Sequence, residues 1–342
     1  MDSLLGLKLK NDVTTAYGLT IIPALTIMEE RHLALLAKHG ITPDSLVYVE
    51  HSRDSKLRRE SGAGKQDAAV RQAVKASKAL FAKMQETRKI PVMELRDEVL
   101  PIVQQAAEAP DVFGLFESIK AKDDYTYEHN IGVGVLATLI GKWMNLNETE
   151  LSVLAMAATL HDVGKVRIPT EILNKPGKLT SEEYAIVKQH TVIGYEMLKG
   201  ATGLNGRVAL VALQHHERSD GGGYPLGLTG EQIDPLSRIV AVADVFHAMS
   251  SRRPYHEPLP FYDTLNQMRQ GKFGFFDPQI VSIFLENMVG RMVGRKVVLT
   301  DGRSGEVVYL NPHSLERPLV RLEDGFIDLS KVIDVHILRV SI

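Results

Sequence analysis

The chain contains no cysteine and has almost no net charge. Without cysteine it forms neither disulfides nor thiolate zinc sites, and it has no cysteine nucleophile. The formal net charge of −2 gives no global basic field, so DNA is not an expected partner. No apolar stretch is long enough to span a membrane, since Ile131–Met144 is short and contains glycine and lysine. The N-terminus also lacks the basic and apolar segments of a secretory leader, so we expect a cytoplasmic protein.

The remaining composition is that of an ordinary globular protein. The 342 residues are 44% hydrophobic and 24% charged, which predicts two or three domains with ample core material. No internal repeat or low-complexity tract is present. Pattern changes along the chain divide it into four regions: a small N-terminal α/β region (1–53), a helical connector (54–110), a helical domain (111–289) and a small C-terminal β domain (290–342).

The two flanking regions have their own turn signals. Residues 12–22 predict a hairpin that turns near Gly18, and Thr26 and Gly40 suit the start and stop of a following helix. Gly62-Ala-Gly64 and Pro91 are expected to interrupt the helices of the connector. Short β-type runs after residue 290, separated by Asp301-Gly302 and Asp324-Gly325, predict a small SH3-like barrel. They are Lys296–Leu299, Gly305–Leu310, Leu319–Leu322 and Val332–Leu338.

Histidines and aspartates recur through the helical domain at nearly regular intervals. Their groups lie roughly 25 to 32 residues apart, about one helix plus one connection, so each group is expected at its own helix facing one interior. Imidazole and carboxylate together suit Fe, Mn, Zn or Ni, and the set is too large for one tetrahedral ion. The series therefore predicts a site for at least two metals. Its members are His129, His161, Asp162, His190, His215, His216 and Asp244, with Asp220 opening the run Asp220–Pro225.

Local patterns place these side chains on helices. His129 shares a face with an apolar stripe, and Asp162 closes an apolar run where an unpaired carboxylate would be costly. Thr180–Glu183 has capping-box spacing, and the helix that follows is expected to place His190 and Gly194 on one face.

The last three members of the series lie near predicted helix ends. Adjacent residues of a helix point about 100° apart, so His215 and His216 reach one site only at a helix end. Asp234-Pro235 predicts the start of a helix that brings Asp244 inward. Each of these residues alone also fits a hydrogen-bonded core or surface role. Together, without cations, they would leave many buried polar groups unpaired.

Three separated motifs carry a family resemblance. His161-Asp162-Val-Gly-Lys165, His215-His216-Glu217-Arg218 and Asp220-Gly-Gly-Gly-Tyr224-Pro225 resemble the signature of the HD-GYP family. These helical phosphohydrolases of the HD superfamily degrade the bacterial second messenger cyclic di-GMP. The resemblance spans about residues 111–289 and implies a mainly α fold built on the HD-superfamily helical bundle.

The resemblance also implies roles for individual residues. It implies two divalent metal ions, Fe or Mn, held by the seven histidines and aspartates above, with Asp162 bridging them. The implied catalytic residues are Asp162, Lys165 and Asp220. The implied substrate-binding residues are Lys165, Arg218, Gly223, Tyr224 and Arg253.

Three positions depart from the family pattern. His247 stands where an acidic residue is common, and His256 stands where a basic residue is common. Both are expected to adjust ligand contacts more than metal binding. Tyr125 stands one turn before the first histidine, where trinuclear members carry Glu, so we expect two metals.

These features favour a metal-dependent phosphodiesterase. It is expected to hydrolyse cyclic di-GMP to pGpG through a metal-bridging hydroxide, and whether the reaction continues to GMP is open. One alternative is an HD hydrolase for another cyclic dinucleotide. Another is a non-catalytic regulator that binds the ligand or a diguanylate cyclase. The helical connector makes a homodimer a further expectation, and no motif indicates the input signal.

Overall fold

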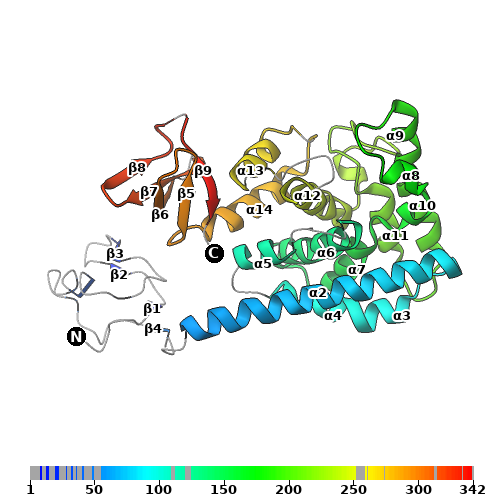
Figure 1. Cartoon of the computed structure of the whole chain (residues 1–342), viewed down its shortest axis with the longest axis horizontal. Helices are drawn as coiled ribbons and strands as arrows, with labels where there is room; N and C mark the ends of the chain where they lie inside the picture. Colours follow the sequence, from blue (N-terminus) through cyan, green and yellow to red (C-terminus); the bar gives the residue numbers. More distant parts are fainter. Residues whose placement is uncertain are drawn as a thin grey trace. The chain divides into compact units, whose positions relative to one another are not determined.

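The computed structural model divides the chain into two compact units, residues 1–64 and 65–342, which we treat separately (Figure 1). The structure describes residues 8–9, 13–14, 20–22, 28, 32–33, 36, 41, 48–49, 55–108, 112–119, 125–251, 259, 261–272, 274–311, 314–332 and 334–340.

The first unit contains two short antiparallel strand pairs. β1 (Lys8–Leu9) pairs with β4 (Tyr48–Val49), and β2 (Val13–Thr14) pairs with β3 (Thr20–Ile22). The β2–β3 pairing confirms the predicted hairpin. The turn at Gly18, and Thr26 and Gly40 as predicted helix ends, lie outside the described residues. A small core holds the unit together, made of Leu9, Val13, Ile22, Met28 and Leu36.

The connector begins with a helix of 33 residues, α2 (Ser55–Thr87). The predicted interruption at Gly62 and Gly64 was wrong, because α2 runs through both glycines. A helical glycine costs only about 1 kcal/mol relative to alanine, which a long helix can tolerate. α2 ends where Arg88 takes a left-handed φ of 58°, and Pro91 follows shortly afterwards. α3 (Val92–Glu94), the π-helical turn η3 (Leu95–Val99) and α4 (Leu100–Ala106) then continue as one helical segment.

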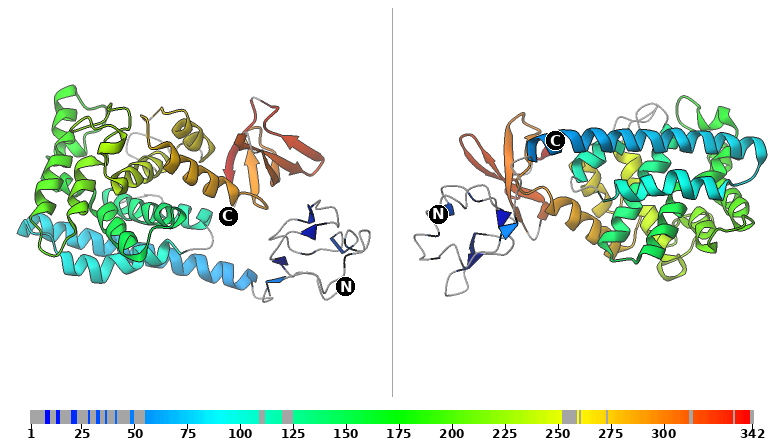
Figure 2. Two further views of the ribbon diagram at one scale, coloured as in Figure 1. Left: turned by 180° about the vertical axis from the view of Figure 1, so that it is seen from behind. Right: turned by 90° about the horizontal axis from the view of Figure 1, so that it is seen from below.

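The rest of the second unit is a helical bundle followed by a sheet (Figures 1 and 2). Within the bundle, α6 packs against α7 and α12, and α10 packs against α11. The helices and single turns are α5 (Val112–Ile119), α6 (Tyr125–Trp143), α7 (Glu148–Leu160), η4 (Val163–Arg167), α8 (Thr170–Leu173), α9 (Ser181–Lys188), α10 (His190–Lys199), α11 (Gly206–Gln214), η5 (Gly230–Gln232), α12 (Pro235–Ser250), α13 (Phe261–Arg269) and α14 (Pro278–Gly290).

Side-chain caps define the starts of α9 and α12. Thr180 forms the predicted capping box with Glu183 at α9, and the Asp234 carboxylate caps α12, which has Pro235 in its first turn. The predicted continuous helix through His190 was wrong, because α9 ends at Lys188 and α10 begins at His190. At the junction the Gln189 N–H bonds the carbonyl three residues earlier, which tightens the turn between the two helices.

The C-terminal strands form one antiparallel sheet in the order β8-β7-β6-β5-β9. The order has two edges, so the described strands form an open sheet and the predicted SH3-like barrel is not confirmed. β8 had no counterpart among the predicted runs. The strands are β5 (Lys296–Leu299), β6 (Ser304–Asn311), β7 (Ser314–Leu322), β8 (Gly325–Asp328) and β9 (Ile337–Val340). β7 and β9 contact α13, which joins the sheet to the bundle.

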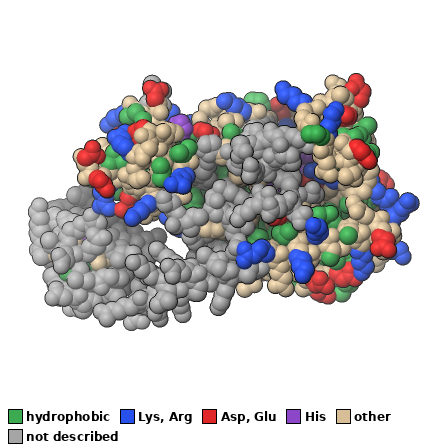
Figure 3. Space-filling view, viewed as in Figure 1, with side chains coloured by type: hydrophobic (Ala, Val, Ile, Leu, Met, Phe, Trp, Pro, Cys, Tyr) green, Lys and Arg blue, Asp and Glu red, His purple; other side chains and the backbone are tan. Residues whose placement is uncertain are grey.

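The described surface carries both signs of charge. On the face shown in Figure 3, Lys and Arg side chains are interspersed with Asp and Glu side chains over the coloured regions. Among the described residues, none of the helices combines the length and apolar character needed to cross a bilayer.

Candidate metal centre

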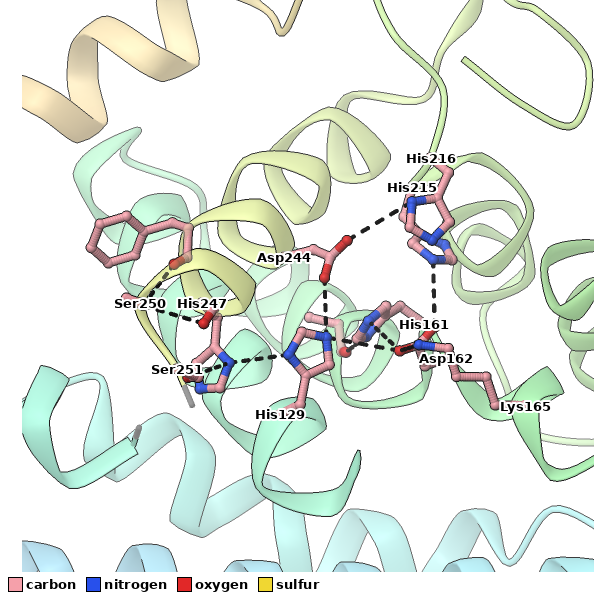
Figure 4. A network of polar contacts seen from close by, with 12 residues as sticks. His129, His161, Asp162, Lys165, His215, His216, Asp244, His247, Ser250 and Ser251 are labelled. Carbon is pink, nitrogen blue, oxygen red and sulfur yellow. Dashed lines mark hydrogen bonds and ion pairs between the residues drawn. The ribbon is translucent and has the colours of Figure 1, made fainter. Parts of the chain in front are cut away.

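The seven histidines and aspartates predicted as ligands meet in the interior of the bundle, and Figure 4 shows six of them, all except His190. α6, α10 and α12 each contribute one of them, and two pairs directly follow the ends of α7 and α11. The donor atoms form two groups: Asp162, His190, His215 and His216 in the first, and His129, His161 and Asp244 in the second. All seven are buried except His216, whose side chain keeps 20% of its surface exposed.

Asp162 lies between the two groups. Its Oδ1 is 3.2 Å from His190 Nε2 and 3.7 Å from His215 Nε2. Its Oδ2 is 3.3 Å from His161 Nε2 and 3.8 Å from His129 Nε2. Each carboxylate oxygen therefore faces a different set of imidazole nitrogens.

Asp244 makes a second connection between the groups. Its Oδ1 is 3.0 Å from His129 Nε2, and its Oδ2 is 3.9 Å from His216 Nδ1. Asp244 lies on α12, whose capped start and apolar buried face direct this carboxylate inward. The prediction that Asp234-Pro235 opens this helix is confirmed.

Backbone carbonyls orient three of the histidines. Each of these rings has its Nδ1 within hydrogen-bond distance of the carbonyl three residues earlier, so Nδ1–H donates and Nε2 is directed to the site. The pairs are His161 with Ala158 (2.6 Å), His190 with Val187 (2.7 Å) and His215 with Ala212 (3.0 Å).

The polar atoms of this interior are not all satisfied. His161 Nε2 and Asp162 Oδ1 are buried, and neither has a hydrogen-bond partner among the described residues. Buried polar atoms normally have one. A cation at each group would satisfy both atoms, and nitrogen and oxygen donors of this kind suit first-row divalent metals. The residues present therefore fit a metal centre.

The electrostatics favour the ligand forms of most of these groups. Burial raises the pKa of Asp162, but the charges of Lys165 and His161 outweigh it and hold that pKa well below its usual range. Burial also raises the pKa of Asp244, but the hydrogen bond from His129 outweighs burial. This pKa therefore lies well below its usual range as well. Burial lowers the pKa of His215 to about 4, so its imidazole is neutral at pH 7.

His161 behaves differently in the absence of a cation. Burial lowers its pKa, but the negative charge of Asp162 outweighs burial and raises it overall. A proton on His161 and a cation would therefore compete for the same place beside Asp162.

Lys165 reaches the same carboxylate. It lies on η4, and its Nζ is 2.5 Å from Asp162 Oδ2 while 26% of its side chain stays exposed. The turn that carries it is pressed against α10, since a Cβ at Gly164 would lie 1.9 Å from the His190 carbonyl oxygen. Glycine at this position allows η4 and α10 to approach closely.

The Gly-Tyr-Pro segment lies beside the first group. The Tyr224 ring stacks on His216 with centroids 4.6 Å apart and an interplanar angle of 26°. A Cβ at Gly223 would lie 2.4 Å from the Glu217 Cα, so glycine is required where this segment crosses the chain that follows the histidine pair. Burial raises the pKa of Tyr224, which keeps its hydroxyl protonated.

The sequence reasoning missed several side chains that lie at this site. The buried Glu217 accepts hydrogen bonds from the backbone N–H groups of Leu226 (2.7 Å) and Leu228 (2.9 Å), which fixes the chain directly after the Gly-Tyr-Pro segment. A buried carboxylate inside a ligand motif was the available signal.

α9 adds two further side chains beside Tyr224. The Tyr184 ring lies edge-on to the Tyr224 ring at 6.4 Å and keeps 48% of its surface exposed. Lys188 Nζ lies 5.7 Å from the centroid of the Tyr224 ring. Their spacing of four residues on one helix face was the signal that could have found them.

Other predicted site residues are placed differently. Arg218 is held against the Phe276 ring at 4.7 Å and donates to the carbonyl of Glu217 at 2.9 Å. Asp220 is exposed, accepts from the Gly222 N–H at 3.0 Å and belongs to neither ligand group, so its observed contact stabilises the turn. Arg253 and His256 lie outside the described residues.

His247 is not at the ligand-facing position that we expected. Its ring is fully buried and its Nδ1 lies 3.0 Å from the Nδ1 of His129. The Tyr125 backbone begins α6, but its side chain lies outside the described part of the structure.

A helical bundle with two adjoining groups of histidine and aspartate donors is compatible with binding divalent metals. Residues 103–280, just over half of the chain, match the family described as HD domain. The chain belongs to the HD domain family.

Two curated relatives and one solved structure extend this result. A cyclic di-GMP phosphodiesterase of Pseudomonas aeruginosa is 38% identical over 204 residues, which are 60% of this chain and 49% of the relative. The 3'3'-cGAMP-specific phosphodiesterase 1 of Vibrio cholerae serotype O1 is 37% identical over 170 residues, which are 49% of this chain and 39% of the relative. The chain thus matches about half or less of these relatives. A structure described as an HDG"Y"P protein from Bdellovibrio bacteriovorus superposes with a TM-score of 0.54 at 15% identity, covering 84% of this chain and 97% of that one, and so supports the fold.

Proposed function

We propose that the chain is a metal-dependent phosphodiesterase that hydrolyses cyclic di-GMP. The observation that carries this proposal is the position of Asp162, whose two oxygens face two separate groups of ligands. A carboxylate placed in this way can bridge two cations. The cyclic di-GMP phosphodiesterase activity of the Pseudomonas aeruginosa relative supports the choice of substrate.

The ligand set is proposed to hold two divalent ions. Imidazole and carboxylate donors suit several first-row metals, and the HD-GYP resemblance implies Fe or Mn among them. Bound there, the ions would neutralise the phosphodiester charge and activate water as a nucleophile. The chain's own contribution is to hold most of these donors buried and in their deprotonated forms. The pKa of His215 near 4 and the lowered pKa of Asp162 provide this at neutral pH.

Lys165 is proposed to position the phosphate. Its ammonium contacts Asp162 directly, and 26% of its side chain is exposed to solvent. An ammonium on a flexible stem interacts with phosphate as a point charge. Tyr224, which extends the imidazole surface of His216, is proposed to support a guanine base by stacking.

A second substrate is also favoured by a specific observation. The Vibrio cholerae relative is described as specific for 3'3'-cGAMP, which differs from cyclic di-GMP in one base. Because base recognition depends on the surroundings of Tyr224, both dinucleotides belong in the same assay.

The experiment uses the full chain purified without oxygen and loaded with Mn²⁺ or Fe²⁺. Cyclic di-GMP and 3'3'-cGAMP are incubated side by side, and the products pGpG and GMP are separated by chromatography. We expect cyclic di-GMP to give the higher kcat/KM. The absence of turnover of either dinucleotide by metal-loaded protein would contradict the proposal.

Two variants separate the proposed roles. Asp162→Ala is expected to lose bound metal and activity together. Lys165→Ala is expected to keep both ions and lose about 100-fold or more in kcat, as for a group that stabilises transition-state charge. Lys178→Ala removes an exposed lysine outside the site and serves as the matched control. Full activity of Lys165→Ala would contradict the role given to Lys165.

A further inference from the structure

Helix α12 contacts both ring nitrogens of His129. On one side, Asp244 Oδ1 lies 3.0 Å from His129 Nε2. On the other side, His247 Nδ1 lies 3.0 Å from His129 Nδ1. Asp244 and His247 are one helical turn apart, and Figure 4 shows the His129 ring between them. One helix therefore supplies the neighbour of Nε2, the nitrogen proposed to bind metal, and also the neighbour of Nδ1.

The direction of these hydrogen bonds follows from their last acceptor. The Ile119 carbonyl oxygen, 2.8 Å from His247 Nε2, can only accept, so His247 Nε2 carries hydrogen and donates. In the neutral His247 ring, Nδ1 is then the acceptor. When a cation replaces the hydrogen between His129 Nε2 and Asp244, the ring hydrogen of His129 lies on Nδ1 and donates to His247 Nδ1. The Ser251 hydroxyl, 3.3 Å away, can donate to the same His247 nitrogen.

This direction is the one that metal binding needs. A cation held between His129 Nε2 and Asp244 requires the lone pair of Nε2, so the one ring hydrogen of neutral His129 must lie on Nδ1. An acceptor beside Nδ1 stabilises that tautomer and fixes the ring plane. His247 supplies this acceptor.

The space for the His247 ring is made by a glycine on the same helix as His129. A Cβ at Gly132 would lie 2.0 Å from His247 Nε2 and 2.3 Å from its Cδ2. Gly132 is one turn beyond His129 on α6, so the imidazole ring of His247 fills the position that any other residue would occupy.

His129 differs in this respect from three other proposed ligands. His161, His190 and His215 are oriented by backbone carbonyls of their own chain segment, which no side-chain substitution removes. His129 instead relies on a side chain from another helix. A substitution of that side chain can therefore change the orientation of His129.

We propose that His247 is a positioning residue for the second ligand group, setting the tautomer and ring orientation of His129 through a hydrogen-bond chain that ends at the Ile119 carbonyl. The proposal rests on the metal centre of the proposed function. It assigns to His247 a role in metal affinity rather than in contacts with the dinucleotide.

The test is Mn²⁺ binding to metal-free full-length protein, measured by equilibrium dialysis and elemental analysis. For the unaltered protein we expect two ions per chain. His247→Phe keeps a ring against Gly132 but cannot accept a hydrogen bond. We expect it to bind one ion normally and the other about 10- to 100-fold more weakly, the usual effect of losing an outer-shell partner of a metal ligand.

Two further variants keep the test decisive if His247→Phe folds poorly. His247→Asn retains an acceptor near the Nδ1 position and is expected to recover most of the lost affinity. Gly132→Ala leaves every polar group intact but displaces the His247 ring, so it is expected to weaken the same ion. Ser250→Ala, a buried substitution on α12 whose hydroxyl donates to the Phe246 carbonyl, is the control and is expected to bind both ions normally.

The outcomes separate this proposal from the proposed function. Normal binding of both ions by folded His247→Phe, or equal losses in His247→Phe and His247→Asn, would overturn the role of His247. The same holds if the unaltered protein binds fewer than two ions. Loss of one ion in His247→Phe, together with no dinucleotide turnover by the unaltered protein, would support the positioning role while rejecting the proposed activity.

Discussion

The protonation state and binding role of each side chain at this site depend on the groups next to its nitrogen or oxygen atoms. Asp162 is buried and has imidazoles on both sides, so it stays ionised and can serve two cations. A carboxylate in the interior without such partners would be costly. For this reason, an aspartate at the end of an apolar run is by itself a signal of a charged partner.

The sequence predicted the set of ligands but not how they are oriented. Regular spacing and helix ends sufficed to bring His161, His190 and His215 together, because each is carried by its own helix. The contact of His247 with His129 joins two helices far apart in the sequence, and no local pattern reveals such a pairing. Asp220 bonds the backbone of its own turn, as carboxylates in glycine-rich turns do, and its catalytic role stays a prediction.

At the scale of single residues, Glu217→Ala tests the support of the Gly-Tyr-Pro segment. The substitution leaves the N–H groups of Leu226 and Leu228 without their acceptor, which costs about 1–3 kcal/mol for each group that stays buried. We expect a raised KM for the dinucleotide with both metal ions retained. Assays of KM and metal content check this, with the exposed Glu171→Ala as control. Loss of metal together with an unchanged KM would contradict it.

At the scale of elements, close contacts between helices fix the site. Capping signals predicted the start of α9 and α12 correctly, because caps depend on a few adjacent residues. The break between α9 and α10 and the continuity of α2 were not predictable in the same way. Both depend on tertiary packing or helix length, which outweigh local propensity.

Gly164→Ala tests the contact between η4 and α10. The new Cβ would meet backbone atoms of His190 and Gly194, which cannot move as a side chain can. We expect a loss of about 1–3 kcal/mol in unfolding free energy together with weaker metal binding. Gly194→Ala is the matched control, because its Cβ would meet the Ala212 side chain at 3.3 Å, and a smaller loss is expected. Urea unfolding compares the two, and an equal or larger loss in Gly194→Ala would contradict this packing argument.

At the scale of the whole molecule, the buried histidines link stability to pH. The pKa of His215 falls to about 4 through burial, and burial also lowers the pKa values of His129 and His216. In the unfolded chain these histidines bind protons more tightly, with a pKa of about 6.5. Their neutral forms therefore contribute stability above pH 6.5, and that stability is lost as the pH falls toward 4. The raised pKa of His161 has the opposite effect, because the stability that it contributes is lost as the pH rises above 6.5.

Metal-free protein is accordingly expected to unfold at lower urea concentration at pH 4.5 than at pH 7. Added Mn²⁺ at pH 7 is expected to stabilise the protein further, by about 2.7 kcal/mol for one ion at 100 times its Kd. Urea unfolding at several pH values in the presence of a chelator measures the first effect. A midpoint that stays constant or rises on acidification through this range would contradict the assignment of neutral buried histidines.

The central claim is that the two ligand groups joined by Asp162 form one catalytic metal centre. The most direct test is to titrate Mn²⁺ into metal-free protein and follow bound metal and cyclic di-GMP cleavage in the same sample. We predict that cleavage appears as the second ion binds and reaches its maximum at two ions per chain. Cleavage that is complete with one bound ion, that persists in chelator, or that is absent with two ions bound would contradict the claim.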